Sequence, residues 1–131
     1  MKWSIQYATG VKRIDEQHKG LFQMSDDFWA ALDEGSGQRV YGLLLESLIA
    51  YARRHFGFEE GCMARCQCPA VQQNSRAHEK FIEALAQFQQ LFDAKGFDRG
   101  DAQRLVEFVD QWLADHIGRV DVLLRPYAEN L

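Results

Sequence analysis

The sequence predicts an all-α fold: an antiparallel, up-down-up-down four-helix bundle with an N-terminal arm, forming one domain over residues 1–131. Four segments carry apolar residues at three- and four-residue steps, the spacing of one face of a helix. The connections between them are short, which favours antiparallel neighbours, and no segment alternates as a strand does. The predicted helices cover residues 15–34, 38–65, 69–94 and 101–120.

A turn of small residues separates the first two predicted helices. The first helix is expected to begin at Asp15, a residue type that often caps a helix N-terminus. Residues 35–37 read Gly-Ser-Gly, which interrupts the helical pattern. Ser36 is expected to cap the second helix, whose apolar stripe runs from Tyr41 to Cys62.

Proline and glycine mark the limits of the third predicted helix. It is expected to begin at Pro69, because proline is favoured in the first turn of a helix, and to end at Gly96. The fourth helix then begins near Asp101, and its inward face runs to Val120.

The composition limits the classes of partner. Hydrophobic residues make up 47% of the chain and charged residues 26%, so a packed core can form. The net charge is −4 and no basic run occurs, so no nucleic-acid partner is expected. No stretch approaches the ~20 apolar residues that span a bilayer, so no membrane partner is expected and a cytoplasmic location is predicted.

Three cysteines lie within seven residues, Cys62 to Cys68. An odd, clustered set does not fit a secreted disulfide framework. Cys62 lies on the core face and is expected to be a small buried residue, with metal ligation as its alternative. Cys66 and Cys68 flank a turn, where we expect more exposure, and could form a disulfide or bind a soft metal.

Polar residues on the apolar faces indicate a metal site. Each predicted helix carries one of the four histidines on its inward face, and two acids lie in step with them. Burying a carboxylate without a partner costs several kcal/mol, and imidazole and carboxylate ligands suit iron, manganese or zinc. The six candidate metal ligands are His18, His55, Glu59, His78, His116 and Asp121.

The four histidines also agree in depth along the predicted bundle. His18 lies near the start of its helix and His55 in the second half of the next. His78 lies in the first half of the third helix and His116 near the end of the fourth. In an antiparallel bundle these positions meet at one end. One such histidine is more often a hydrogen-bonded core residue, but four at one level predict a shared metal centre.

Motifs in all four helices resemble those of the bacterial hemerythrins, and the resemblance covers nearly the whole chain. The order and spacing of the motifs match, although each motif alone is weakly specific. They are DEQHKGLF at 15–22, HFGFEE at 55–60, HEKF at 78–81, and WLADHI at 112–117 followed by Asp121; Trp3 and residues 9–11 match the family's N-terminal arm.

This resemblance implies a non-haem centre of two iron ions (Fe²⁺/Fe³⁺) with a bridging oxo or hydroxo group. It implies that two histidines, His18 and His55, hold one iron and leave a place for dioxygen. It further implies that His78 and His116 hold the other iron, and that Glu59 and Asp121 bridge the pair.

The family resemblance also implies a function. Leu113 matches a leucine that lines the oxygen pocket of the family, and dioxygen is the implied partner. We therefore expect reversible dioxygen binding, for storage, delivery or sensing, rather than enzymatic turnover. The alternatives are a di-iron peroxidase or oxidase, and an interaction module whose surface responds to oxygen or redox state.

The sequence departs from the family pattern at one position. The third helix of hemerythrins usually reads HxxxH, but here Asn74 stands four residues before His78, on the same face. The oxygen of Asn74 could ligate the iron, a water could take the place, or the metal could exchange easily. We expect Asn74 or a water there, and a more labile centre than in an Asn74→His variant.

Overall fold

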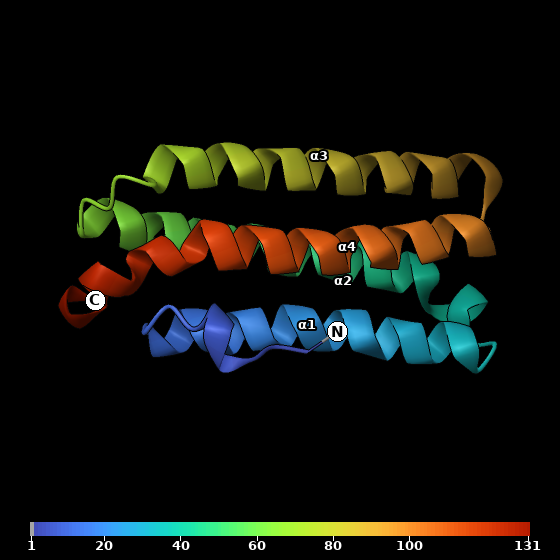
Figure 1. Ribbon diagram of the computed structural model, residues 1–131. Helices are drawn as coiled ribbons and strands as arrows, with labels where there is room; N and C mark the ends of the chain where they lie inside the picture. The colour runs from blue at the N-terminus through green and yellow to red at the C-terminus, as the bar shows by residue number, and fades with distance from the viewer. Residues whose placement is uncertain (1) are drawn as a thin grey trace.

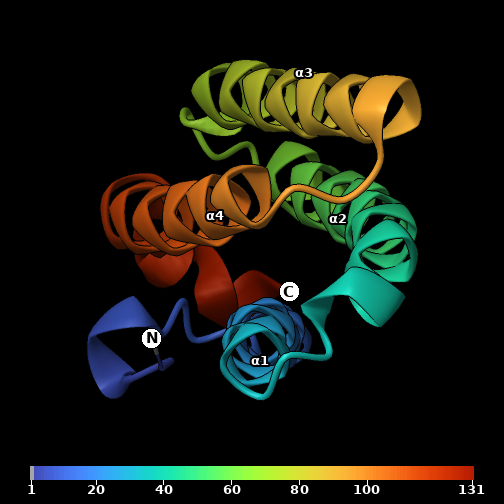
Figure 2. The same cartoon turned by 90° about the vertical axis from the view of Figure 1, so that its right-hand side faces the viewer.

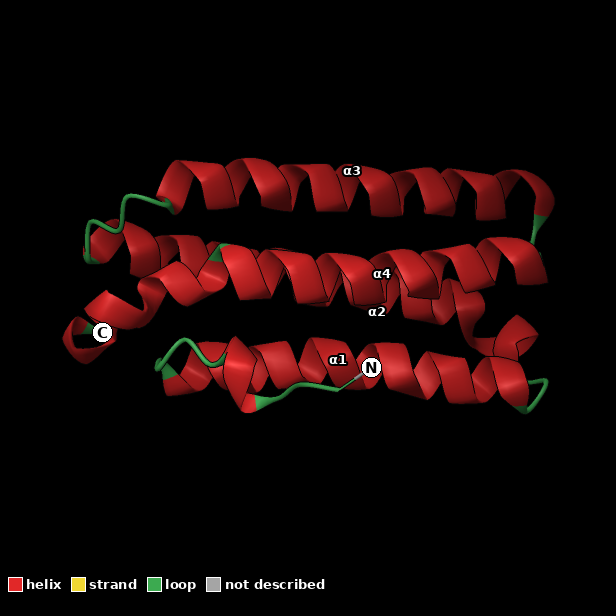
Figure 3. Cartoon of the chain, viewed as in Figure 1, coloured by secondary structure: helices red, strands yellow, loops and turns green. Residues whose placement is uncertain are grey.

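The structure, a computed structural model, describes residues 2–131 and confirms the all-α fold. No strand occurs within that range, as the colouring in Figure 3 makes plain. Two short 3-10 segments flank the four long helices. The elements are η1 (Ile5–Tyr7), α1 (Lys12–Asp33), α2 (Gly37–Arg65), α3 (Val71–Lys95), α4 (Arg99–Arg119) and η2 (Asp121–Asn130).

The four helices form a bundle in which consecutive helices run in opposite directions. Figure 1 shows α3, α4 and α1 one below another with α2 behind α4, and Figure 2 looks along the bundle with one helix at each corner. The start of α1, the end of α2, the start of α3 and the end of α4 therefore share one end, where η2 also lies. This is the end at which the sequence places all four histidines.

The first helix begins earlier than the sequence predicts. It starts at Lys12, so the expectation that Asp15 is the N-cap is wrong; Val11 occupies that position without a side-chain cap. Instead, Oδ1 of Asp15 accepts hydrogen bonds of 2.8 Å from both the backbone N–H and the hydroxyl of Thr9. Burial of Ile14 supports the extra turn, and Asp15 fastens the N-terminal arm to it.

The starts of the last two helices also differ from expectation. Pro69 lies in a turn, and α3 begins at Val71, where its first regular bond runs from the N–H of Asn74 to the carbonyl of Ala70. Helix α4 begins at Arg99, because the side chain of Asp98 caps it by accepting from the N–H of Asp101. Because Asp98 caps the helix three residues before Asp101, the helix is longer at its start than expected.

The segment after α4 was not predicted as a helix, although it supplies part of the site. It forms η2, whose first residue is Asp121 and which contains Pro126. Arg125 donates hydrogen bonds of 2.7 Å to the carbonyls of Ala8 and Gln6. These bonds tie η2 to the N-terminal arm, and η2 thereby turns the chain across the end of the bundle (Figure 1).

The core consists of apolar side chains from all four helices, including Leu21, Leu45, Leu85 and Leu105. A second apolar cluster fills the end of the bundle near η2; it contains Ile14, Cys62, Met63, Cys68, Ala70 and Leu124. Cys62 is buried as expected, but Cys68 is also buried, so the expected exposure of Cys68 is wrong. The turn folds back under α2 and carries its thiol inward. All three cysteines have free thiols.

No helix between residues 2 and 131 combines the length and the apolar character needed to cross a bilayer.

Candidate metal centre

All six predicted ligand residues meet at one end of the bundle. Every one is buried, and none is more than 6% exposed. The helical spacing explains the arrangement, because it directs each side chain from its own helix to the bundle axis. His18 comes from α1, His55 and Glu59 from α2, His78 from α3, His116 from α4 and Asp121 from the first turn of η2.

The six side chains form two overlapping groups of potential metal ligands. Within each group, ligand atoms of all four residues lie within 4.8 Å of one another. The two carboxylates belong to both groups, whereas each group has its own pair of histidines. We call the group with His18 and His55 the α1–α2 half, and the group with His78 and His116 the α3–α4 half.

Glu59 divides its two oxygens between the two halves. Its Oε2 lies 2.9 Å from Nε2 of His18 and 3.3 Å from Nε2 of His55. Its Oε1 lies 3.3 Å from Nε2 of His78. A carboxylate in this position can bridge two cations with one oxygen on each.

Asp121 divides its oxygens in the same way. Its Oδ2 lies 3.1 Å from Nε2 of His18, and its Oδ1 lies 3.0 Å from Nε2 of His116. Yet Oδ1 is buried and makes no hydrogen bond to any described residue. The carboxylate oxygen and the imidazole nitrogen thus share a space without hydrogen-bond geometry, as two ligands of one cation would.

The imidazoles of the α3–α4 half also lie close together. Nε2 of His116 lies 3.2 Å from Nε2 of His78. At most one proton can lie between two such nitrogens, so at least one of them presents a lone pair to the other. A cation between them satisfies both lone pairs, and the nitrogen and carboxylate donors suit iron. The residues present therefore fit a dinuclear iron centre.

Two outer hydrogen bonds orient the imidazoles, and we did not predict either from the sequence. Nδ1 of His55 donates to Oε1 of Gln17 over 2.6 Å, and Nδ1 of His78 donates to Oε2 of Glu60 over 2.9 Å. A proton fixed on Nδ1 leaves the Nε2 lone pair directed at the cluster. The only sequence signal is adjacency: Gln17 precedes a ligand residue and Glu60 follows one.

Aromatic rings hold two of the imidazoles from the side. The ring of Phe56 stacks on His78 with centroids 3.7 Å apart and an interplanar angle of 4°. The ring of Trp112 stacks on His116 at 4.3 Å and 14°. Leu113, the expected pocket residue, is completely buried in the core three positions before His116.

Asn74 also belongs to the centre, as its helical register predicts. Its side chain is completely buried. Its Oδ1 lies 2.6 Å from Nε2 of His116, while its Nδ2 donates to Oε1 of Glu59 over 2.7 Å and to the sulfur of Met63 over 3.2 Å. The amide oxygen therefore faces the α3–α4 half.

The electrostatics of the cluster favour a charged His18 and a charged Glu59 in the absence of metal, but not a charged His55. Burial alone lowers the pKa of His18, but hydrogen bonds and charge interactions with Asp121 and Glu59 outweigh it and raise the pKa to about 10. Burial likewise opposes ionisation of Glu59, yet hydrogen bonds from His18, His55 and His78 hold the pKa of Glu59 well below its usual range. Burial lowers the pKa of His55. The site is thus built for a carboxylate surrounded by positive charge.

Two surface pockets reach the α3–α4 half. One, of about 470 Å³, lies between α2 and α3 and is lined by His78 and Glu60; we call it the α2–α3 pocket. The other, of about 420 Å³, lies between α3 and α4 and is lined by His116, Trp112 and Gln73. Both imidazoles can therefore be approached from the protein surface.

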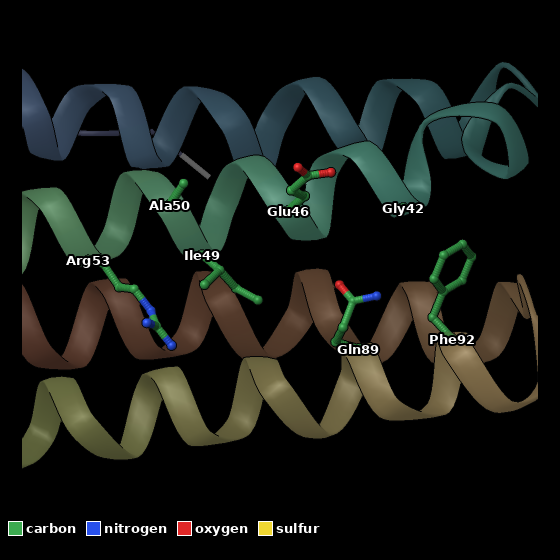
Figure 4. A pocket seen from close by; sticks show the side chains of 7 residues that line it. All are labelled: Gly42, Glu46, Ile49, Ala50, Arg53, Gln89 and Phe92. Carbon is green, nitrogen blue, oxygen red and sulfur yellow. The ribbon is translucent and has the colours of Figure 1, made fainter.

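A larger surface groove of about 680 Å³ lies towards the other end of the bundle. Figure 4 shows it between α2 and α3, with Ile49 and Arg53 on one side and Gln89 and Phe92 on the other. Gln89 is about 16 Å beyond His78 along the helix axis, at 1.5 Å per residue. None of the six predicted metal ligands lines the groove, although Arg53 lines both the groove and the α2–α3 pocket.

Comparisons with known proteins agree with this geometry. Residues 9–128 match the Hemerythrin HHE cation binding domain. The chain is 31% identical over 130 residues to a bacteriohemerythrin of Methylococcus capsulatus, which covers 96% of this chain and 95% of the relative. It is 30% identical over 119 residues to a bacteriohemerythrin of Pseudomonas aeruginosa, with 91% and 75% covered.

The fold is similar to that of a solved structure. A crystal structure described as wild-type hemerythrin superposes with a TM-score of 0.87 at 29% identity. The superposition covers 98% of this chain and 97% of that one. The expected family and the expected bundle are both confirmed.

Proposed function

Because this chain belongs to the hemerythrin family of non-haem iron, oxygen-binding proteins, we propose that it binds dioxygen reversibly at a carboxylate-bridged di-iron centre. One observation carries the proposal: Glu59 and Asp121 each direct one oxygen to each pair of histidines. Buried carboxylates are costly unless positive charge lies beside them, and two iron ions would supply that charge to both oxygens of each carboxylate.

The proposed ligand sets follow the two halves of the cluster. His18 and His55 would hold one iron, and His78 and His116 would hold the other. Glu59 and Asp121, which belong to both groups, would be shared by the two ions, and the family resemblance implies an oxo or hydroxo group beside them. The outer hydrogen bonds to Gln17 and Glu60 keep the Nε2 lone pairs of His55 and His78 directed inward.

When bound, the two iron ions would supply the electrons that dioxygen takes up on binding. The residues of this chain supply apolar surroundings and two carboxylates. The buried apolar core around Leu113 would exclude water from the core side of the centre, and this would limit the loss of reduced oxygen from the site. The carboxylates of Glu59 and Asp121 screen the two cations from each other, which lowers the repulsion between them.

The direct test uses iron-loaded, freshly reduced protein. We expect two iron ions per chain, and a visible spectrum that develops in air and is reversed under vacuum. Glu59→Gln should lose metal, because one bridging charge is removed, whereas Glu46→Gln on the exposed face of the same helix should not. A wild-type protein that retains fewer than two metal ions, or whose spectrum does not reverse, would contradict the proposal.

An enzyme of the peroxidase or oxidase type is the second candidate function. The observation in its favour is that two surface pockets reach His78 and His116, where a substrate could approach the centre. Peroxide-dependent oxidation of a dye by the iron-loaded protein, with rapid bleaching of its spectrum, would favour this candidate over reversible binding.

A further inference from the structure

We propose that Asn74 is itself a metal ligand, binding through its amide oxygen to the cation of the α3–α4 half, so that the two metal positions are unequal. This inference rests on the proposed function, because it requires the dinuclear centre. It assigns to the α3–α4 half three kinds of donor: imidazole, carboxylate and amide oxygen.

The first argument is the position of the amide oxygen. Oδ1 of Asn74 lies 2.6 Å from Nε2 of His116, which in turn lies 3.0 Å from Oδ1 of Asp121 and 3.2 Å from Nε2 of His78. All of these atoms face one small space. Separations of about 3 Å between donor atoms are those expected around one cation with bonds near 2 Å.

The second argument concerns which amide atom faces the metal. Nδ2 of Asn74 has two acceptors, Oε1 of Glu59 at 2.7 Å and the sulfur of Met63 at 3.2 Å. Both acceptors would be lost if the amide were turned round, and the –NH₂ group would then face the imidazoles. The surroundings therefore fix the oxygen as the inward atom.

The third argument is the balance of lone pairs when a metal is bound. Nε2 of His116 then gives its lone pair to the cation and carries no proton. Oδ1 of Asn74, only 2.6 Å away, would be left as a completely buried acceptor beside a nitrogen that has no proton to donate. An unsatisfied buried polar atom costs about 1–3 kcal/mol, and binding to the same cation removes that cost.

The consequence is a difference between the two metal positions. A neutral amide oxygen is a weaker donor than an imidazole or a carboxylate, but it adds a fifth protein ligand to the two histidines and two carboxylates of the α3–α4 half. Replacing it with a stronger donor should slow the release of one metal ion of the two. Removing it should speed the release of that same ion.

The test measures release of Zn²⁺ or Co²⁺ into an excess of chelator from the intact, metal-loaded chain. Asn74→Leu keeps the branching of the side chain at Cγ, although leucine is bulkier, and it removes the donor; we expect one of two metal ions to leave at least tenfold faster than in the wild type. Asn74→Asp and Asn74→His place a stronger donor at the same position, and both should release that ion more slowly. Gln72→Leu, at an exposed position of the same helix, is the control and should release both ions at the wild-type rate.

The variants separate ligation from a role in which Asn74 merely holds Glu59. Asn74→Asp keeps an inward oxygen but cannot donate to Oε1 of Glu59. If Asn74→Asp releases metal as fast as Asn74→Leu, or if Asn74→Asp and Asn74→His both match the wild type, the inference is overturned. The comparison of Asn74→Asp and Asn74→His with the wild type tests the inference even if Asn74→Leu does not fold.

Failure of the proposed function gives a different result. A wild-type chain that binds fewer than two metal ions overturns the dinuclear centre, and this inference with it. A wild-type chain that binds two ions, with release rates that no Asn74 variant alters, overturns this inference alone.

Discussion

Nδ1 of His78 donates a hydrogen bond to Oε2 of Glu60 over a distance of 2.9 Å. The imidazole is 3% exposed and the carboxylate side chain 31%, so the pair joins the buried centre to the α2–α3 pocket. A carboxylate in this position holds the ring and increases the basicity of Nε2, which improves that nitrogen as a ligand.

We predict that Glu60→Gln weakens metal binding in the α3–α4 half by about tenfold, the lower end of the effect expected for loss of a ligand's supporting partner. Competition with a coloured chelator measures the affinity. Glu79→Gln removes the same charge from the same pocket and makes no bond to His78, so it is the matched control. Equal effects of the two substitutions would show that only the pocket charge matters.

Metal uptake by the metal-free protein should displace protons. The pKa of His18 is raised to about 10, so its imidazole is protonated at neutral pH and must lose that proton to bind metal. The affinity should therefore rise with pH, by about tenfold per pH unit for each proton displaced, until the pH approaches 10. Titration with Zn²⁺ in weakly buffered solution with a pH indicator tests this. An affinity that is constant between pH 6.5 and 8.5 would contradict the prediction.

Leu113→Ala should act on both stability and oxygen chemistry. Removing a completely buried leucine side chain costs roughly 2–5 kcal/mol of unfolding free energy. If Leu113 lines the oxygen pocket, the cavity also admits water, and the reduced protein oxidises faster in air. Leu105 lies two turns further from His116 on α4 and is equally buried, so Leu105→Ala is the control. Leu105→Ala should lose a similar amount of stability without oxidising faster. If the two variants oxidise at the same rate, Leu113 does not have the role assigned to it.

Tyr41→Phe tests a buried hydroxyl that is remote from the metal centre. The Tyr41 side chain is buried, and its hydroxyl has no hydrogen-bond partner among residues 2–131. Phenylalanine should therefore raise the unfolding free energy at pH 7 by about 1 kcal/mol. The hydroxyl of Tyr51 donates to the carbonyl of Gln17 over 2.9 Å, so Tyr51→Phe, the control, should lower it.

Tyr41→Phe should also change how the stability of the protein depends on pH. Burial and the negative charge of Asp101 raise the pKa of Tyr41 to about 12, whereas an unfolded tyrosine ionises near 10. Between these values only the unfolded chain has lost the proton, so the wild type loses stability as the pH rises from 10 to 12. Urea denaturation at pH 8 and pH 11 should show less of this loss in Tyr41→Phe. If Tyr41→Phe loses as much stability between pH 8 and pH 11 as the wild type, other groups cause the loss.

The sequence by itself determined the helices and the set of inward side chains. A helical repeat of 3.6 residues is a local property, so the spacing of His55 and Glu59 or of His78 and Asn74 fixes a shared face without knowledge of the neighbouring helices. The antiparallel order of the helices then placed the four histidines at one level. Boundaries were less well determined, as Asp15 and Pro69 show, because one buried residue or one cap moves a helix start by a turn.

Only the tertiary structure decided how the side chains meet. Gln17 and Glu60 lie beside ligand residues in the sequence, but their bonds to His55 and His78 depend on how α1, α2 and α3 are rotated against one another. The inward turn of Cys68 and the placement of Asp121 depend on segments outside the helical repeat. The direction of the Asn74 amide depends on Glu59 and Met63 together. Contacts between elements are set by packing across the bundle, which no local pattern encodes.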